Sequence, residues 1–163
     1  LKFLLGAHFE VDPRNVHAFM IGEHGDTELP VYSSANVSGI DFDHFCQSCQ
    51  RHCDQEVLRT IYEEVKNSAY EVIENKGATY YAIALAVLRI VEALMRDEHS
   101  VLTVSVLPEG HYELNELCIG LPAIVGQGGI EKVLDVPLDT DEWDRLQKSA
   151  AQMKKVIGEI HWE

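Results

Sequence analysis

The sequence predicts an α+β fold in which an antiparallel sheet packs against long helices. Between residues 41 and 95, apolar residues recur at helical spacing. Between residues 101 and 125, short runs rich in branched residues follow one another, with connections too short to hold crossover helices. Because helices and strands come in separate runs instead of alternating, the pattern favours α+β over α/β.

The first predicted element is a short strand over residues 15–22, Asn-Val-His-Ala-Phe-Met-Ile-Gly. The run Gly22-Glu23-His24-Gly25-Asp26 ends it, because its two glycines break the pattern. A second short strand is expected at Pro30-Val31-Tyr32. The first strand therefore delivers His24 into a loop.

Two long helices are expected next. The first carries apolar residues at helical spacing, namely Leu58, Ile61, Tyr62, Val65, Ala69, Val72 and Ile73. The second, Thr79 to Met95, is apolar almost all round, which predicts a central helix buried on most sides.

Three strands and a final helix complete the predicted fold. The strands are Val101–Leu107, Leu117–Leu121 and Ala123–Val125, most simply arranged antiparallel. Asp139, with Glu142 three residues later, is typical of a helix cap. The apolar stripe of that helix is Trp143, Leu146, Ala150, Met153, Ile157 and Ile160.

Composition excludes two classes of partner. The 163 residues, 46% of them hydrophobic, fit one domain with one substantial core. Thirteen basic against twenty-seven acidic residues give a formal charge of −14, which repels nucleic-acid phosphates and anionic membranes. No uncharged apolar run approaches the roughly twenty residues of a membrane span. We therefore expect neither nucleic-acid nor membrane binding.

The chain begins at Leu1 instead of a methionine, so we expect it to be part of a longer protein. It has no Gly-x-Gly-x-x-Gly fingerprint, so we expect no dinucleotide-binding domain within it. The cysteines, at positions 46, 49, 53 and 118, lack the even scatter of a secreted disulfide framework. We therefore expect reduced thiols and a cytoplasmic location.

His24 is the main catalytic candidate. It lies between glycines in a loop held by a strand, and Glu23 and Asp26 are close enough in sequence to tune its titration. Such a histidine can exchange protons near neutral pH. The alternative is that it only hydrogen-bonds nearby backbone, as most loop histidines do.

Residues 16–33, Val-His-Ala-Phe-Met-Ile-Gly-Glu-His-Gly-Asp-Thr-Glu-Leu-Pro-Val-Tyr-Ser, resemble the active-site histidine segment of L-lactate dehydrogenases. The resemblance continues through Asn75–Ala84, Val101–Leu107 and Ile119–Ala123, so it covers nearly the whole chain. Related malate dehydrogenases usually have a second glycine in place of Glu23 and differ at residues 76–79, which favours lactate. Residues 1–163 thus resemble the substrate-binding, catalytic C-terminal domain of this family, without its N-terminal Rossmann NAD-binding domain.

The resemblance implies hydride transfer with NAD that interconverts pyruvate and L-lactate, with His24 as proton donor and acceptor. In the family an aspartate orients this histidine and an arginine binds the substrate carboxylate, and both lie in an Asp-x-x-Arg segment that would precede Leu1. The family pattern does not give Asp26 the orienting role. We therefore expect the full-length protein to be active and the isolated chain inactive.

The resemblance assigns two further residues to the site. Thr79 resembles the pocket threonine that limits substrate size, and Ile83 resembles the residue packed against the nicotinamide. Without the resemblance, the same residues would be interpreted as a helix start and a core position.

An allosteric site is implied at Lys2 and His17. They match positions where bacterial lactate dehydrogenases bind the activator fructose 1,6-bisphosphate between subunits, with a histidine and an arginine. Lysine keeps the charge but lacks the two-point grip of arginine on phosphate, so we expect activation to be weak or absent. Two ordinary surface cations are the alternative.

The resemblance also implies a cytoplasmic homo-oligomer, a dimer or homotetramer, that acts in glycolysis and pyruvate fermentation. It leaves open a dehydrogenase of a larger 2-hydroxy acid, because the loop that closes over the substrate belongs to the other domain. Residues 109–115 lack the glycine that commonly follows Tyr112 in the family, so we expect the turn there to differ.

A competing hypothesis from another class starts at residues 44–53, His-Phe-Cys-Gln-Ser-Cys-Gln-Arg-His-Cys. Cys46, Cys49 and Cys53 fall on one helical face and could bind a metal, which would make this a small Cys/His metal-binding module. Three small residues packed against a core fit the same stripe. We expect no metal site.

Overall fold

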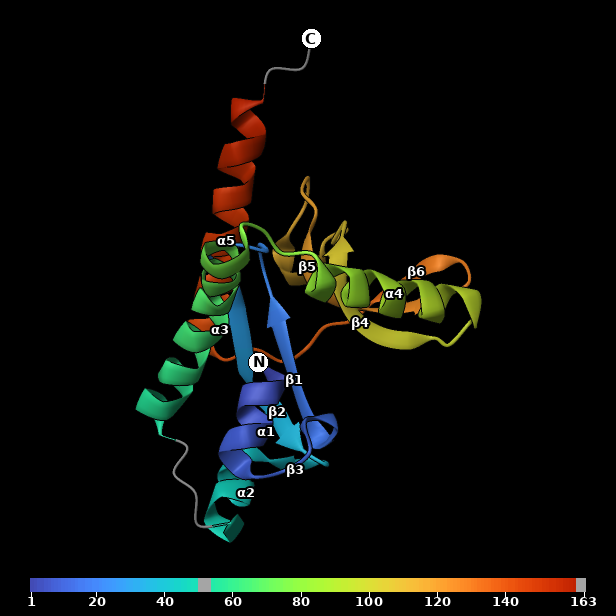
Figure 1. Cartoon of the computed structure of the whole chain (residues 1–163). Helices are drawn as coiled ribbons and strands as arrows, with labels where there is room; N and C mark the ends of the chain where they lie inside the picture. Colours follow the sequence, from blue (N-terminus) through green and yellow to red (C-terminus); the bar gives the residue numbers. More distant parts are fainter. Residues whose placement is uncertain (50–53, 161–163) are drawn as a thin grey trace. The chain divides into compact units, whose positions relative to one another are not determined.

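The computed structural model describes residues 1–49 and 54–160 and divides the chain into two compact units (Figure 1). Unit 1 comprises Leu1–Phe19 and Pro30–Thr79, and unit 2 comprises Met20–Leu29 and the chain from Tyr80 onward. Each unit combines helices with a three-stranded sheet. The predicted α+β fold class is confirmed.

Unit 1 contains most of the first sheet and three helices. Its elements are α1 (Lys2–Phe9), β1 (Val16–Ile21), β2 (Leu29–Val37), β3 (Ile40–Asp41), α2 (Phe42–Cys49) and α3 (Gln55–Lys76), with a short 3₁₀ turn at Pro13–Asn15. The sheet order is β1-β2-β3, and β2 and β3 pair antiparallel. The predicted first strand is confirmed, whereas the second extends well beyond residues 30–32.

Aromatic contacts and one hydrogen bond hold unit 1 together. The ring of Phe9 packs edge-on against Phe42 and Phe45, with centroid separations of 5.0 and 5.3 Å. The hydroxyl of Tyr32 on β2 donates to the carbonyl of Leu58 on α3 at 2.9 Å. The sheet and α3 are therefore joined by a polar contact beside the apolar core.

Unit 2 is built around the second sheet. Its elements are α4 (Tyr81–Met95), β4 (Ser100–Val106), a short 3₁₀ turn (His111–Glu113), β5 (Ile119–Gly126), β6 (Gly129–Val133) and α5 (Thr140–Glu159). The order is β4-β5-β6, with both pairings antiparallel. The predicted antiparallel arrangement is confirmed for these strands.

The prediction of separate strands at Leu117–Leu121 and Ala123–Val125 is wrong, because both runs lie in or beside the single strand β5. The predicted break was Pro122, which cannot donate to a neighbouring strand. The Pro122 carbonyl accepts from the N–H of Leu134, just past the end of β6. Pro122 therefore lies where the pairing between β5 and β6 ends, and no hydrogen bond to β6 is lost there. β6 itself was not predicted, because Gly129-Ile130-Glu131-Lys132-Val133 is short and mostly exposed.

Helix α5 starts as its sequence predicts. The Asp139 carboxylate accepts from the backbone N–H of Glu142 at 2.8 Å, and the Glu142 carboxylate accepts from that of Asp139 at 3.1 Å. This capping box satisfies two backbone donors that the helix leaves unpaired. The side chain of Leu146, one turn on, is fully buried.

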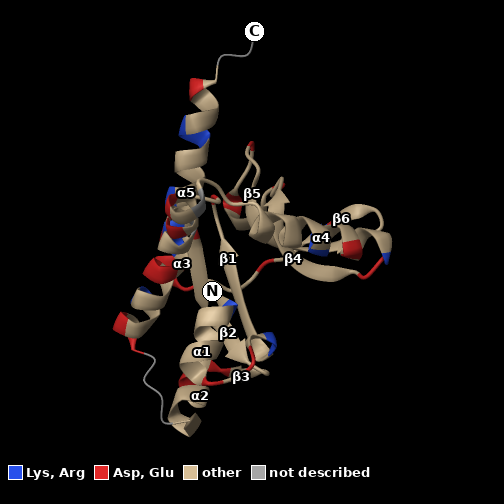
Figure 2. Cartoon of the chain, in the orientation of Figure 1, with Lys and Arg blue, Asp and Glu red and all other residues tan. Residues whose placement is uncertain are grey.

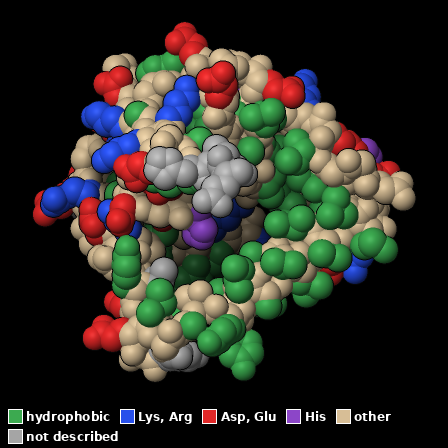
Figure 3. Space-filling model, turned by 90° about the horizontal axis from the view of Figure 1, so that it is seen from above, with side chains coloured by type: hydrophobic (Ala, Val, Ile, Leu, Met, Phe, Trp, Pro, Cys, Tyr) green, Lys and Arg blue, Asp and Glu red, His purple; other side chains and the backbone are tan. Residues whose placement is uncertain are grey.

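Helix α4 is not buried on most sides within this chain, contrary to the expectation. Its exposed large side chains are Tyr81, Ile83, Leu85, Val87, Leu88, Val91 and Met95. In Figure 3 hydrophobic side chains form a broad surface on the right, the side on which Figure 1 shows α4. An apolar surface of this kind is typical of a contact that the chain makes with something else.

The turn after β4 adopts left-handed backbone angles without glycine. Tyr112 and Glu113 have φ of 53° and 60°, values that glycine adopts without strain. The hydroxyl of Tyr112 accepts from the backbone N–H of Val136 at 2.5 Å, and burial raises the pKa of this phenol. Glu113 thus occupies the position of the missing family glycine.

Charged side chains are spread over the helices and loops of both units instead of forming one patch (Figure 2). Among residues 1–49 and 54–160, no helix is long and apolar enough to cross a membrane.

The start of α2 gives a pH-dependent prediction. Asp41 Oδ1 accepts from the backbone N–H of His44 at 2.9 Å, and Asp41 Oδ2 lies 2.6 Å from His44 Nδ1. The Asp41 hydrogen bond raises the pKa of His44 above 6.5, and the His44 hydrogen bonds lower the pKa of Asp41 below 3.8. We predict that Asp41→Asn returns the pKa of His44 toward 6.5, measured by NMR titration of its ring protons.

The sign of the stability effect follows from these two shifts. The His44 contribution is complete below pH 6.5 and is lost as pH rises through its raised pKa. The Asp41 contribution is complete above pH 3.8 and is lost as pH falls through its lowered pKa. Asp43→Asn is the control, since Asp43 contributes the smallest of the effects on His44. An unchanged His44 pKa in the Asp41 variant would contradict the assignment.

Candidate active site

The loop that carries His24 is held against β5 by a contact between two glycine backbones. The N–H of Gly22 donates to the carbonyl of Gly120 at 2.9 Å, and the N–H of Gly120 donates back to Gly22 at 3.0 Å. A Cβ on residue 120 would lie 2.8 Å from the Gly22 carbonyl oxygen, which is too close. Gly22 itself has φ of 98°. Both positions therefore need glycine.

A buried serine on α5 fixes the next part of the loop. The backbone N–H of Glu23 donates to Ser149 Oγ at 2.8 Å, and Thr27 Oγ1 lies 3.0 Å from the same oxygen. Thr27 also donates to the Glu23 carboxylate. Ser149 is fully buried. The loop is therefore fixed on both sides of His24.

The imidazole of His24 projects into solvent from this anchored loop, with its side chain fully exposed. The carboxylate of Glu28 lies close to it, with Oε2 3.6 Å from His24 Nδ1, and the Glu28 side chain is only 17% exposed. Glu28 forms an ion pair with His24, and the Glu23 carboxylate accepts from Thr27.

This arrangement suits proton exchange with a bound molecule. A protonated imidazole is stabilised by a carboxylate, and a separation of 3.6 Å is too long for a hydrogen bond that would occupy Nδ1. An exposed ring on a fixed backbone keeps both nitrogens accessible. The geometry is therefore compatible with a role of His24 as an acid/base.

The predicted pocket residues Ile83 and Thr79 lie in and just before α4. Ile83 is in the first turn of α4 with 60% of its side chain exposed, and it belongs to the same unit as His24. Thr79 is half-buried, lies just before Tyr80, the N-cap of α4, and ends unit 1. The expected helix start is thus two residues later than Thr79.

Lys2 lies on α1 and His17 on β1, both in unit 1, and both side chains are exposed. In the part of the chain that the structure describes, no hydrogen bond or ion pair joins the two. They are free to meet an anion, which is what the allosteric interpretation requires.

The alternative hypothesis of a metal-binding module needs the thiols of Cys46, Cys49 and Cys53. Cys46 is disulfide-bonded, so its sulfur is not a thiolate, and this differs from the expected reduced state. Cys49 is a free thiol on α2, whereas His52 and Cys53 lie outside the described residues. Helical spacing places cysteines on one face but does not fix their oxidation state.

Sequence reasoning missed the residues that position His24, namely Gly120, Ser149 and Glu28. A signal existed for Ser149, because it lies three residues after Leu146 on the apolar stripe of α5, where a polar residue needs a partner. No local pattern links Gly22 to Gly120, since the contact joins distant segments.

The whole chain matches one known family. Residues 1–162 match the family described as lactate/malate dehydrogenase, alpha/beta C-terminal domain. The chain belongs to the lactate/malate dehydrogenase family.

Curated relatives of this lactate/malate dehydrogenase domain are about twice as long as the chain. It is 54% identical to an L-lactate dehydrogenase of Acetivibrio thermocellus over 96% of this chain and 49% of the relative. It is 46% identical to L-lactate dehydrogenase 1 of Clostridium acetobutylicum, over 98% of this chain and 51% of the relative. The chain thus spans about half the length of the curated relatives it matches.

A solved structure confirms the lactate/malate dehydrogenase C-terminal fold. The crystal structure of a lactate dehydrogenase from a Medee basin deep-sea metagenome library superposes with a TM-score of 0.92 and 35% identity. The match covers 96% of this chain and 50% of that one.

The glycine contact in this lactate/malate dehydrogenase domain gives a second prediction. Gly120→Ala should destabilise the fold by about 1–3 kcal/mol, because the added Cβ pushes the Gly22 carbonyl away. Gly128→Ala is the matched control: no atom lies within 4 Å of its Cβ position, so its effect should stay within about 0.5 kcal/mol. Chemical denaturation of both variants measures the difference. Equal stabilities would contradict the anchoring role.

Proposed function

We propose that the full-length protein containing this chain is an NAD-dependent L-lactate dehydrogenase, and that the chain is its catalytic C-terminal domain. The observation that carries the proposal is the presentation of His24, fully exposed on a loop fixed by Gly22, Gly120 and Ser149. The curated relatives at 54% and 46% identity, both named L-lactate dehydrogenases, support the choice of substrate.

His24 supplies the proton in this reaction. Bound NADH would supply a hydride to C2 of pyruvate, which would place negative charge on the carbonyl oxygen. Protonated His24 hydrogen-bonds that oxygen and then transfers its proton to it, which gives L-lactate. In the reverse direction neutral His24 accepts the hydroxyl proton. Pyruvate, NADH and one proton thus balance lactate and NAD⁺.

The rest of the site divides between this chain and the remainder of the protein. The exposed apolar side chain of Ile83 fits contact with the flat nicotinamide ring, and Thr79 limits the space for the substrate side chain. The chain has no dinucleotide fingerprint, so an N-terminal Rossmann domain binds most of NAD. That half also provides the aspartate that orients His24 and the arginine that binds the substrate carboxylate.

The exposed apolar surface of α4 supports a larger, oligomeric protein. Side chains such as Leu85 and Met95 are 66% and 80% exposed, and an apolar surface of this kind is typical of a contact with other polypeptide. The proposal includes, as the family resemblance implies, that the full-length enzyme is a cytoplasmic homo-oligomer that acts in fermentation of pyruvate.

The catalytic role of His24 gives the third prediction. His24→Asn in the full-length protein should lower kcat/KM for pyruvate by about 10²–10⁴, because asparagine keeps a hydrogen-bond donor but transfers no proton. NADH oxidation followed by absorbance measures it. His111→Asn is the control, since His111 pairs with Asp135 at 2.8 Å, away from the loop of residues 22–28.

Substrate comparison in the same assay decides between the proposal and its nearest alternative. Pyruvate should be preferred over oxaloacetate and over 2-oxo acids with longer side chains. Preference for a longer 2-oxo acid, still lost in the His24 variant, would instead identify a dehydrogenase of a larger 2-hydroxy acid. Unchanged turnover in that variant would overturn the role of His24.

Allosteric activation by fructose 1,6-bisphosphate is part of the proposal and gives the fourth prediction. The exposed Lys2 and His17 can each offer a positive charge to a phosphate. Lys2→Ala should raise the activating concentration about tenfold, whereas Lys2→Arg should lower it, because the guanidinium binds phosphate through two donors. Lys132→Ala on β6 is the control. Activation curves of the full-length enzyme measure all three, and a wild type insensitive to the bisphosphate would exclude the site.

A further inference from the structure

A histidine and two carboxylates outside the active site come together on the surface of unit 2. Nδ1 of His99 lies 2.7 Å from the carboxylate of Glu131 on β6, and Nε2 lies 3.6 Å from Asp97 Oδ1. One candidate ligand atom from each residue lies within 4.8 Å of the other two. Among the described residues, these three form the group of His, Cys, Asp or Glu side chains that could hold a metal ion. Ligands of one metal ion are at most about 4 Å apart, so small side-chain rotations suffice.

Gly126 provides the space in which the two carboxylates converge. A Cβ at residue 126 would overlap Glu131 Oε1 and lie 3.0 Å from Asp97 Oδ1. The backbone of Gly126 does not have a positive φ, so its conformation does not demand glycine. The missing side chain is therefore explained by the carboxylates, which occupy its place.

The turn between α4 and β4 holds two of the three ligands on a rigid backbone. Asp97 has φ of 50° directly after the C-cap residue Arg96; its N–H donates to Leu94, and that of Glu98 donates to Ala93. This is the bonding pattern of a Schellman motif. The Asp97 carboxylate is further fixed by the backbone N–H of Gln127, at 2.8 Å.

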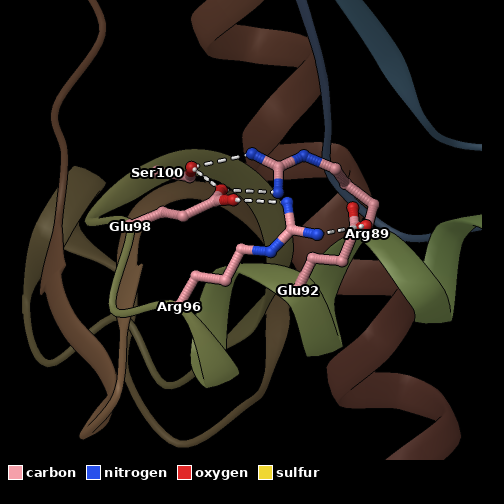
Figure 4. A network of polar contacts seen from close by, with 5 residues as sticks. All are labelled: Arg89, Glu92, Arg96, Glu98 and Ser100. Carbon is pink, nitrogen blue, oxygen red and sulfur yellow. Dashed lines mark hydrogen bonds and ion pairs between the residues drawn. The ribbon is translucent and has the colours of Figure 1, made fainter.

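Glu98, between the two ligands in sequence, takes part in a separate ion-pair network (Figure 4). Its carboxylate pairs with Arg89 at 2.7 Å and accepts from the Ser100 hydroxyl at 2.9 Å. Arg96 pairs with Glu92 at 3.4 Å and with Glu98 at 3.9 Å. Both arginines near the turn are thus compensated by their own carboxylates, which leaves Asp97 and Glu131 as net negative charge around His99.

We propose that Asp97, His99 and Glu131 bind a divalent first-row metal ion such as Mn²⁺. One imidazole nitrogen and two carboxylate oxygens suit an ion that accepts mixed nitrogen and oxygen ligands and completes its shell with water. The imidazole must be neutral to bind the ion, so metal binding competes with protonation of the ring. The sequence predicts no metal site. It does not identify these ligands because Glu131 lies 32 residues from His99 along the chain.

The first-row ion tested is Mn²⁺, which binds thiolates poorly, so that the free Cys49 and Cys118 do not compete. The full-length protein is titrated with Mn²⁺, and free Mn²⁺ is measured by its electron paramagnetic resonance signal. The wild type should bind one equivalent more than His99→Ala, or bind it at least tenfold more tightly. Gly126→Ala should weaken binding as well, because its Cβ displaces both carboxylates.

Two controls separate a built site from general attraction to an acidic protein. His111→Ala removes a histidine paired with one carboxylate, Asp135, and Gly128→Ala adds a Cβ in open space. Both should bind Mn²⁺ like the wild type. Thermal unfolding without metal checks that each variant folds, and His99→Gln replaces His99→Ala where it does not.

Equal binding by the wild type and the His99 variants, or binding without saturation, would show general attraction only and overturn the proposal. The test is independent of the proposed function, because it measures binding and not turnover. Loss of pyruvate reduction in the His24 variant and loss of Mn²⁺ binding in the His99 variant are separate outcomes.

Discussion

The backbone contact between Gly22 and Gly120 is the constraint on which the presentation of His24 depends. Two reciprocal hydrogen bonds of 2.9 and 3.0 Å join a loop to a central strand, and neither residue can carry a side chain there. Once this contact is made, Ser149 can reach the N–H of Glu23, and the histidine between these anchors projects outward on a fixed backbone. A catalytic base needs such fixed placement more than it needs burial.

His24 lies on a well-fixed loop, but its side chain is fully exposed in this chain. The carboxylate of Glu28 lies 3.6 Å from the His24 ring, and large apolar side chains of α4 are exposed among the described residues. The chain spans about half the length of its curated relatives. An exposed apolar helix face is typical of a contact surface.

Local rules predicted the elements whose signals are local. The Asp139–Glu142 capping box and the span of β4 both follow from residues a few positions apart. They failed at Pro122, because whether a proline interrupts a strand depends on where the neighbouring strand ends. The predicted burial of α4 was also wrong, because an apolar sequence does not tell which surface packs against the helix.

The sequence by itself determined the family and the fold class and made His24 the catalytic candidate, because contiguous residues and helical or strand periodicity carry this information. Tertiary structure alone decided which carboxylate lies beside His24, which glycine and serine fix its loop, and that Asp97, His99 and Glu131 meet around Gly126. Those contacts join segments up to 126 residues apart, and no local pattern of side chains carries information over that separation.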